Sequence, residues 1–210
     1  MSRQTNHGEG VLYTVSAPSG AGKTSLVKAL LQQNPRIELS VSHTTRQPRP
    51  GEQNGSDYHF IDSQQFLTMV EQHAFLEHAE VFGNFYGTAH ASINQRLAAG
   101  VDVILEIDWQ GAAQIQQSCP EAKSIFILPP SLTVLESRLR GRQSDSEAVI
   151  QRRLSEAVYE MRHYTLFNYL IINDNFTTAL ADLEAIFHCQ QLRTARQYEK
   201  LKTTVDALIA

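Results

Sequence analysis

The sequence predicts an α/β protein built on a parallel β-sheet with helices on both faces. Strand-like and helix-like segments alternate along most of the chain, as they do where crossover helices join parallel strands. The strand-like segments are unbroken apolar runs, which is typical of strands that are buried on both faces. A glycine-rich loop joins the first strand to the first helix, an arrangement that phosphate-binding α/β proteins share.

The elements follow from the apolar periodicity in chain order. Unbroken apolar runs predict strands at residues 10–15, 101–107, 124–128 and 169–172. Helical spacing predicts helices at residues 24–33, 89–99, 131–140 and 148–166, and a last amphipathic stretch from Thr178 onward. Asn34 and Pro35 end the first helix.

Two segments interrupt this alternation. Residues 40–88 consist of short segments between turn signals, and they predict a small, mostly β insert with one helix near residues 63–73. Residues 138–155 are polar and arginine-rich with few apolar side chains to bury, and they predict a mobile lid. The rest of the chain, residues 1–39, 89–137 and 156–210, is assigned to the core, so that one unit spans about residues 10–190.

Length and composition exclude several classes of protein. The 210 residues suffice for one domain with small inserts but not for two full catalytic domains. A content of 42% hydrophobic and 19% charged residues argues against a disordered or fibrous protein. The chain lacks the ~18-residue apolar run of a membrane helix, a secretory signal and, with two cysteines, a disulfide framework. We therefore expect a soluble, cytoplasmic protein without a metal-bound scaffold.

The glycine-rich loop has the composition of a phosphate-binding loop, or P-loop. Glycines at two positions let backbone N–H groups turn toward phosphate oxygens, and the helix that follows adds its positive dipole end. Lys23 would bind the β- and γ-phosphates, and the Thr24 hydroxyl would help to hold Mg²⁺. Ala17 stands where the general pattern has its first glycine, which weakens the match more than the chemistry. The candidate nucleotide-binding residues here are Ala17, Pro18, Ser19, Gly20, Ala21, Gly22, Lys23 and Thr24.

A carboxylate follows the strand predicted at residues 101–107. Asp108 lies where a P-loop protein presents an acidic side chain toward the metal and the nucleotide. Residues 108–111 also spell the D-x-x-G of GTPases. Those proteins select guanine through an Asn-Lys-x-Asp stretch, and no Asn-Lys pair occurs in this chain, which argues against a GTPase.

Arginines gather in two short windows of a chain whose net charge is −4. The net charge argues against nucleic acid as a partner. One window holds Arg36, Arg46 and Arg49, and the other holds five arginines between residues 138 and 153. A lone arginine pair is most often a solvated surface, but this concentration in an acidic chain favours a local anionic ligand.

Several motifs, taken together and in order, resemble guanylate kinase. They lie at residues 17–24, 42–52, 55–60, 75–79, 83–88 and 107–111. The resemblance covers the chain from about residue 11 to residue 174 and implies a P-loop NTPase-type core with an NMP-binding insert. It also implies the reversible reaction ATP + GMP = ADP + GDP of purine nucleotide metabolism, with Mg²⁺ as MgATP and no tightly bound organic cofactor.

The resemblance also implies roles for particular side chains. The phosphate of GMP would be held by Arg46, Arg49, Tyr58 and Tyr86, since arginine forks and phenols suit a phosphate dianion. Ser42, Glu77 and Thr88 would surround the guanine, with Asp108 near GMP and the metal; adenine has no N1–H to donate to Glu77. Arg138, Arg142 and Arg153 would close over the triphosphate beside the catalytic Lys23, and Asn173 would lie near the adenine of ATP.

Three alternatives remain open. A related kinase with the same core would phosphorylate another acceptor, such as ribose 1,5-bisphosphate, and an adenylate-type kinase would use AMP. The three predicted guanine-binding residues argue against both. A scaffold domain that binds peptides would have lost the phosphate loop, which is intact here. The partners expected are therefore these nucleotides, with no nucleic acid or membrane, while apolar positions in the C-terminal helix would allow self-association.

Overall fold

The computed structural model describes residues 9–81, 83–141 and 146–210, and it confirms a parallel sheet as the core. The five strands lie in the order β2-β7-β1-β8-β9, and all four pairings are parallel. They are β1 (Leu12–Ser16), β2 (Ile37–Leu39), β7 (Asp102–Glu106), β8 (Lys123–Leu128) and β9 (Tyr169–Ile172). Sequence analysis missed β2, because three residues are too few to show a pattern.

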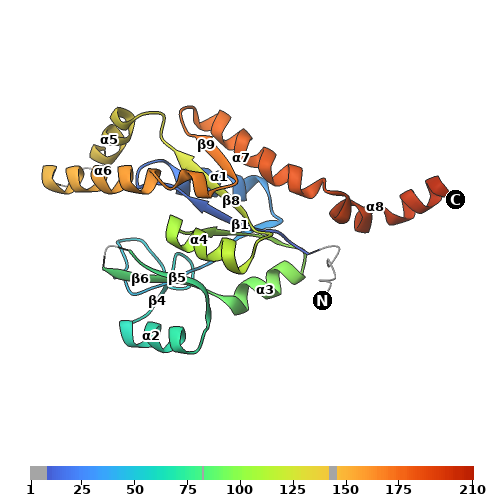
Figure 1. Cartoon of the computed structure of the whole chain (residues 1–210), viewed down its shortest axis with the longest axis horizontal. Coiled ribbons are helices and arrows are strands. Elements are labelled where there is room, and N and C mark those ends of the chain that lie inside the picture. Colours follow the sequence, from blue (N-terminus) through green and yellow to red (C-terminus); the bar gives the residue numbers. More distant parts are fainter. Residues whose placement is uncertain (1–8, 82, 142–145) are drawn as a thin grey trace.

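Helices cover both faces of this sheet (Figure 1). They are α1 (Lys23–Gln33) and α7 (Phe176–Gln191) on one face and α3 (His90–Ala98) and α4 (Trp109–Ser118) on the other. The other helices of the core are α5 (Leu132–Arg140), α6 (Glu147–Met161) and α8 (Thr194–Ile209). Successive residues of β1 face opposite layers: Leu12 packs with the side chains of α3 and α4, and Tyr13 with those of α1 and α7. This double burial explains the unbroken apolar runs, since each buried Leu or Ile contributes about 1.5–3 kcal/mol.

Helix α4 was not predicted, because its surface toward the core is narrow. Its buried residues are only Gly111, Ala112 and Ile115, and glycine lowers helix propensity. Asp108 is the N-cap of the helix, and its carboxylate accepts a hydrogen bond from the backbone N–H of Gly111 at 2.9 Å. The helix is therefore stabilised by its side-chain cap and by packing against the sheet, although its sequence shows no broad apolar face.

The prediction of one helix over residues 148–166 was wrong at its end. Helix α6 stops at Met161, and a 3-10 turn follows at Tyr164–Leu166. The ring of His163 stacks on Trp109 with centroids 3.6 Å apart, a tertiary contact that local periodicity does not reveal. The last amphipathic stretch is likewise two helices, α7 and α8, which meet at Leu192 and Arg193.

Residues 40–88, for which turn signals predicted a mostly β insert, contain most of a second sheet and one helix. This sheet has the order β4-β3-β6-β5, with strands β3 (His43–Thr44), β4 (His59–Phe60), β5 (Phe75–Val81) and β6 (Asn84–Ala89). Helix α2 (Ser63–Glu71) begins with a capping box between Asp62 and Gln65. In Figure 1 the insert lies at the lower left and α5 and α6 at the upper left, so both lie at one end of the main sheet.

One glutamine of α4 ties the insert to the core. The backbone N–H of His78 donates to Gln114 Oε1 at 3.1 Å, and Gln114 Nε2 donates to the carbonyl of His78 at 2.7 Å. Strand β5 is the edge of its sheet, so this amide satisfies backbone groups that an edge strand leaves unpaired. The contact fixes where β5 lies relative to the main sheet.

The C-terminal helix α8 extends away from the rest of the molecule (Figure 1). Its first turn is anchored by an ion pair of 2.9 Å between Arg196 and the buried Asp102. Beyond this anchor Leu201, Leu208 and Ile209 are exposed. Self-association through α8 stays a prediction. Within the described ranges, no helix has both the length and the apolar character needed to cross a bilayer.

Acidification is expected to destabilise the insert through two neighbouring histidines. His43 of β3 pairs in register with His59 of β4, and their ring centroids lie 4.7 Å apart. Burial lowers the pKa of His43 below its ordinary 6.5, and His59 lowers it further. Because the folded state disfavours protonated His43, this contribution to stability is complete above about pH 6.5 and is lost as the pH falls.

Replacing His59 with phenylalanine is expected to reduce that loss, because a phenyl ring can pack against His43 without adding charge. The free energy of unfolding of both proteins, measured in urea between about pH 7.5 and about pH 5.5, checks this. The difference between the two proteins isolates the histidines, since Glu77, with a pKa of about 7, titrates in the same range. Identical pH dependence in both proteins would contradict the prediction.

Candidate functional site

A cavity of about 350 Å³ lies between the glycine-rich loop and the insert. It brings together predicted residues from four separate parts of the sequence. The loop and the start of α1 contribute Ala17, Pro18, Ser19, Gly20, Gly22, Lys23 and Thr24. The first half of the insert contributes Ser42, Arg49 and Tyr58, strands β5 and β6 contribute Glu77 and Tyr86, and the residue before α4 is Asp108. The predicted residues that do not line it are Ala21, Arg46, Thr88, Arg138, Arg153 and Asn173, and Arg142 lies outside the described part of the chain.

The loop can adopt its shape only with glycine at two positions. Gly20 and Gly22 have φ angles of 91° and 93°, a region that residues with a Cβ rarely adopt. A Cβ at Gly22 would also lie 2.3 Å from Nδ2 of Asn173. That amide is buried and donates to the carbonyl of Ala21 at 2.7 Å. Asn173 therefore fixes the backbone of the loop at the residue before Gly22.

A second cavity of about 300 Å³ opens on the other side of the loop. It is lined by Gly20, Gly22, Ser25, Arg138, Asn173, Asp174 and Phe176. Arg138 donates to the carbonyl of Asn173 at 3.0 Å and to that of Ala21 at 3.4 Å. Asn173 thus both supports the loop and lines a cavity next to it, whereas the sequence suggested only a place near a bound base.

Glu106 is a candidate functional residue that sequence analysis missed. Its Oε2 accepts a hydrogen bond of 3.3 Å from the hydroxyl of Thr24, and its Oε1 is buried with no hydrogen-bond partner among the described residues. Asp108, the predicted carboxylate, is instead occupied in part by capping α4 and by Gln110, which donates to its Oδ2 at 3.1 Å. The one sequence feature that could have pointed to Glu106 is that it is the acidic residue near the end of an otherwise apolar strand.

Three predicted residues of the insert form a buried chain of hydrogen bonds. The hydroxyl of Thr88 donates to Glu77 Oε1 at 2.6 Å, and the hydroxyls of Ser42 and Thr88 lie 3.2 Å apart. Glu77 is only 3% exposed, and burial raises its pKa to about 7. Gly111 of α4 is close enough that a Cβ there would lie 2.6 Å from Glu77 Oε2. The carboxylate is therefore confined from two sides.

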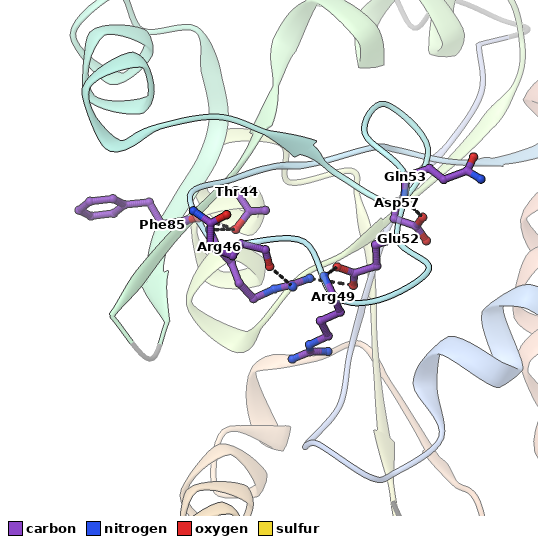
Figure 2. A network of polar contacts seen from close by, with 8 residues as sticks. Thr44, Arg46, Arg49, Glu52, Gln53, Asp57 and Phe85 are labelled. Atoms are coloured by element: carbon purple, nitrogen blue, oxygen red, sulfur yellow. Dashed lines mark hydrogen bonds and ion pairs between the residues drawn. The ribbon is translucent and has the colours of Figure 1, made fainter. Parts of the chain in front are cut away.

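The predicted phosphate-binding side chains of the insert gather next to this chain. The guanidinium of Arg46 lies over the ring of Tyr58, 5.4 Å from its centroid, and the rings of Tyr58 and Tyr86 are 6.0 Å apart. Arg46 also forms an ion pair of 2.8 Å with Glu52. Figure 2 shows the guanidinium of Arg49 pointing away from Glu52, and Arg49 lines the cavity. This corner of the cavity is rich in donors for an anion.

Helix α6 brings further charged groups to the loop. Arg153 donates to the hydroxyl of Ser19 at 2.8 Å, and Glu160, which sequence analysis missed, lines the cavity. Burial raises the pKa of Glu160 to about 7, while Lys23 opposes this shift. Arg140 is engaged by Glu147 and Glu136, and the predicted Arg142 lies outside the described residues.

The arrangement can bind a polyphosphate and a second, smaller anion side by side. Backbone N–H groups and Lys23 offer the donors that the first would need, and the arginines and tyrosines of the insert offer those for the second. The buried carboxylate of Glu77 between them can accept two N–H donors in one plane. Such a site suits transfer of a phosphoryl group between two phosphorylated ligands.

Comparisons with known proteins point to one family. A model of the guanylate kinase family matches residues 10–190. The guanylate kinase of Escherichia coli (strain K12) is 56% identical over 204 residues, which cover 96% of this chain and 99% of that protein. That of Salmonella typhimurium (strain LT2) is 55% identical with the same coverage. The crystal structure of guanylate kinase from Anaplasma phagocytophilum matches with a TM-score of 0.74 and 34% identity, covering 93% of this chain and 95% of that one.

Proposed function

Because the chain belongs to the guanylate kinase family, whose enzymes phosphorylate GMP with ATP, we propose a specific division of labour for this reaction in its two cavities. MgATP binds on the loop of residues 17–24, with its base toward Asn173, and GMP binds against the insert of residues 40–88. The segment of residues 138–155 closes over the triphosphate as a lid, and residues 1–39, 89–137 and 156–210 form the core.

Lys23 and the backbone N–H groups at the start of α1 bind the β- and γ-phosphates. Mg²⁺ accompanies the triphosphate, and the Thr24 hydroxyl and the Glu106 carboxylate would hold it together with phosphate oxygens. Support comes from the chemistry of these two groups: both offer hard oxygen donors, and Glu106 Oε1 is buried without a hydrogen-bond partner in the described part of the chain. When bound, Mg²⁺ would offset negative charge on the phosphate oxygens.

The buried Glu77 is the observation that carries the choice of acceptor. A guanine base presents N1–H and an exocyclic amine on one edge, and a carboxylate accepts from both. Adenine has no N1–H, so it would leave a buried carboxylate partly unpaired at a cost of about 1–3 kcal/mol or more. Thr88 and Ser42 orient this carboxylate through their hydrogen bonds and complete the base site. Asp108 lies beside it in the cavity.

The acceptor phosphate binds to Arg46, Arg49, Tyr58 and Tyr86, and it already carries the negative charge that attack requires. A general base is therefore not needed, and alignment with electrostatic stabilisation supplies the catalysis. Arg138 and Arg153 stabilise the transferring phosphoryl group, together with Arg142, which is proposed on the sequence alone. Closure of the lid excludes water, which would otherwise hydrolyse ATP.

A coupled assay for ADP release tests the acceptor assignment. With MgATP we expect turnover with GMP at least about 100-fold faster than with AMP, CMP, UMP or no acceptor. A control reaction with the same enzyme concentration and no acceptor measures the background hydrolysis of ATP, which lid closure is proposed to suppress. Turnover with AMP at a comparable rate would contradict the role of Glu77, and turnover only with another phosphorylated acceptor would indicate a related kinase.

A further inference from the structure

One carboxylate in the insert binds both arginines that we assign to the acceptor phosphate. Glu52 Oε1 accepts from Arg46 Nη2 at 2.8 Å, and Glu52 Oε2 accepts from the backbone N–H of Arg49 at 2.6 Å (Figure 2). Hydrogen bonding to Arg46 lowers the pKa of Glu52, so the side chain is ionised at neutral pH. Neither sequence patterns nor the assignment of GMP-binding residues gave Glu52 a role.

The contact with Arg49 closes a tight turn from both ends. The backbone N–H of Glu52 donates to the carbonyl of Arg49 at 3.0 Å, and Gly51 has a φ of 89° after Pro50. Proline followed by glycine with positive φ is the sequence of a type II turn. The Glu52 side chain returns to the first residue of that turn, so it fixes the point from which the Arg49 side chain extends into the cavity.

The contact of Glu52 with the Arg46 side chain uses one N–H donor of that arginine. A guanidinium has five N–H groups, and Arg46 uses one toward Glu52 and one toward the carbonyl of Gln47 at 2.7 Å. Its plane rests on the Tyr58 ring. The side chains of Arg46 and Glu52 are 15% and 19% exposed, so this ion pair is less screened by water than a surface pair. The remaining N–H groups are held in one orientation.

We propose that Glu52 is a positioning residue that orients Arg46 and Arg49 for the acceptor phosphate. The inference rests on the proposed function, in which these two arginines bind the phosphate of GMP. A free arginine loses considerable rotamer freedom when it binds a ligand, and a side chain that is oriented beforehand loses less. Glu52 therefore strengthens binding of the phosphate without touching it.

A competing role would have the opposite sign. If Glu52 occupied the donors that the phosphate needs, its removal would free Arg46 and tighten GMP binding. Glu52 occupies one of the five N–H groups of Arg46, which argues against such competition, as does the use of Glu52 Oε2 for the turn rather than for a second guanidinium contact.

Glu52→Gln tests the proposal, because it keeps the shape of the side chain but places an amide against Arg46. We expect the KM and the Kd for GMP to rise about 10-fold to 50-fold, the range of a lost hydrogen bond to a charged group. The kcat at saturating GMP and the KM for ATP should change less than threefold. The inhibition constant of guanosine, which lacks the phosphate, should not change, whereas a merely structural role would weaken guanosine and GMP alike.

Asp57→Asn is the matched control, since Asp57 also caps a turn of this loop, by accepting from the backbone N–H of Gln53 at 2.8 Å, but contacts neither arginine (Figure 2). It should leave the KM for GMP within twofold. If Glu52→Gln lowers the melting temperature by many degrees, Glu52→Asp, which keeps the charge but shortens the reach, should still show a loss confined to GMP.

Arg46→Ala separates failure of this inference from failure of the proposed function. If Arg46→Ala weakens GMP but Glu52→Gln does not, the positioning role is wrong and the phosphate site stands. If Arg46→Ala leaves GMP binding unchanged, both are wrong. Tighter GMP binding in Glu52→Gln would likewise overturn the positioning role. In the Arg46→Ala background the effect of Glu52→Gln should shrink to less than half, because only the Arg49 contact remains.

Discussion

Replacing Lys23 with alanine is expected to lower kcat about 10³-fold while the protein stays folded. Lys23 is the first residue of α1, and it lines the cavity beside Thr24 and Asp108. A preorganised positive charge at the transferring phosphoryl group is worth about 10²–10⁵ in rate. Alanine has the higher helix propensity, so the melting temperature should not fall. Steady-state kinetics with MgATP and GMP, together with a thermal melt, measure both quantities.

Lys28→Ala is the matched control, because Lys28 is an exposed residue of the same helix and does not line the cavity. It should leave kcat within twofold. Lys23→Arg should recover little activity, since a planar fork does not replace a compact ammonium between two phosphates. If Lys23→Ala raised only the KM for ATP and kept kcat, Lys23 would contribute to ground-state binding alone.

The parts of the fold that sequence analysis predicted are those encoded by neighbouring residues. The four longer core strands are local apolar runs, and the insert with its one helix was predicted from turn residues between short segments. The phosphate loop is also local, since its two glycines and Lys23 lie within four positions. These elements needed no knowledge of what packs against them.

The parts that escaped prediction depend on contacts between distant residues. Thr24 and Glu106 are 82 positions apart, and Asn173 reaches Ala21 across 152 positions. Neither pairing leaves a trace in local composition, so Glu106 had no role and Asn173 was assigned only to a base. The end of α6 is similar, because the stacking of His163 on Trp109 is decided by the tertiary fold. Topology creates these contacts after the local elements exist.

Replacing Glu77 with glutamine is expected to raise the KM for GMP about 100-fold and the KM for ATP less than threefold. A glutamine offers only one acceptor and turns an amide toward the donors of guanine, so a buried pairing is lost at a cost of about 1–3 kcal/mol. Glu80→Gln is the matched control, since Glu80 is an exposed residue of the same strand β5. Equal losses for both nucleotides would mean that Glu77 holds the fold of the site rather than the base.

The same residue is expected to make GMP binding depend on pH. In the free enzyme burial raises the pKa of Glu77 to about 7 from an ordinary 4.5. Folding therefore favours the protonated carboxyl, and this group lowers the stability of the fold as the pH rises from about 4.5 to about 7. Guanine donors require the ionised form. Binding of GMP should therefore release up to one proton below about pH 7, and affinity should rise with pH until it levels off above that value.

Calorimetry in two buffers of different ionisation enthalpy measures the proton released, and Glu77→Gln supplies the baseline. That baseline is needed because the phosphate of GMP itself titrates near pH 6. The difference in affinity between the two proteins should widen from about pH 5.5 to about pH 7 and stay constant above it. A difference that is constant over the whole range would show that Glu77 is already ionised in the free enzyme, and that neighbouring donors outweigh the effect of its burial.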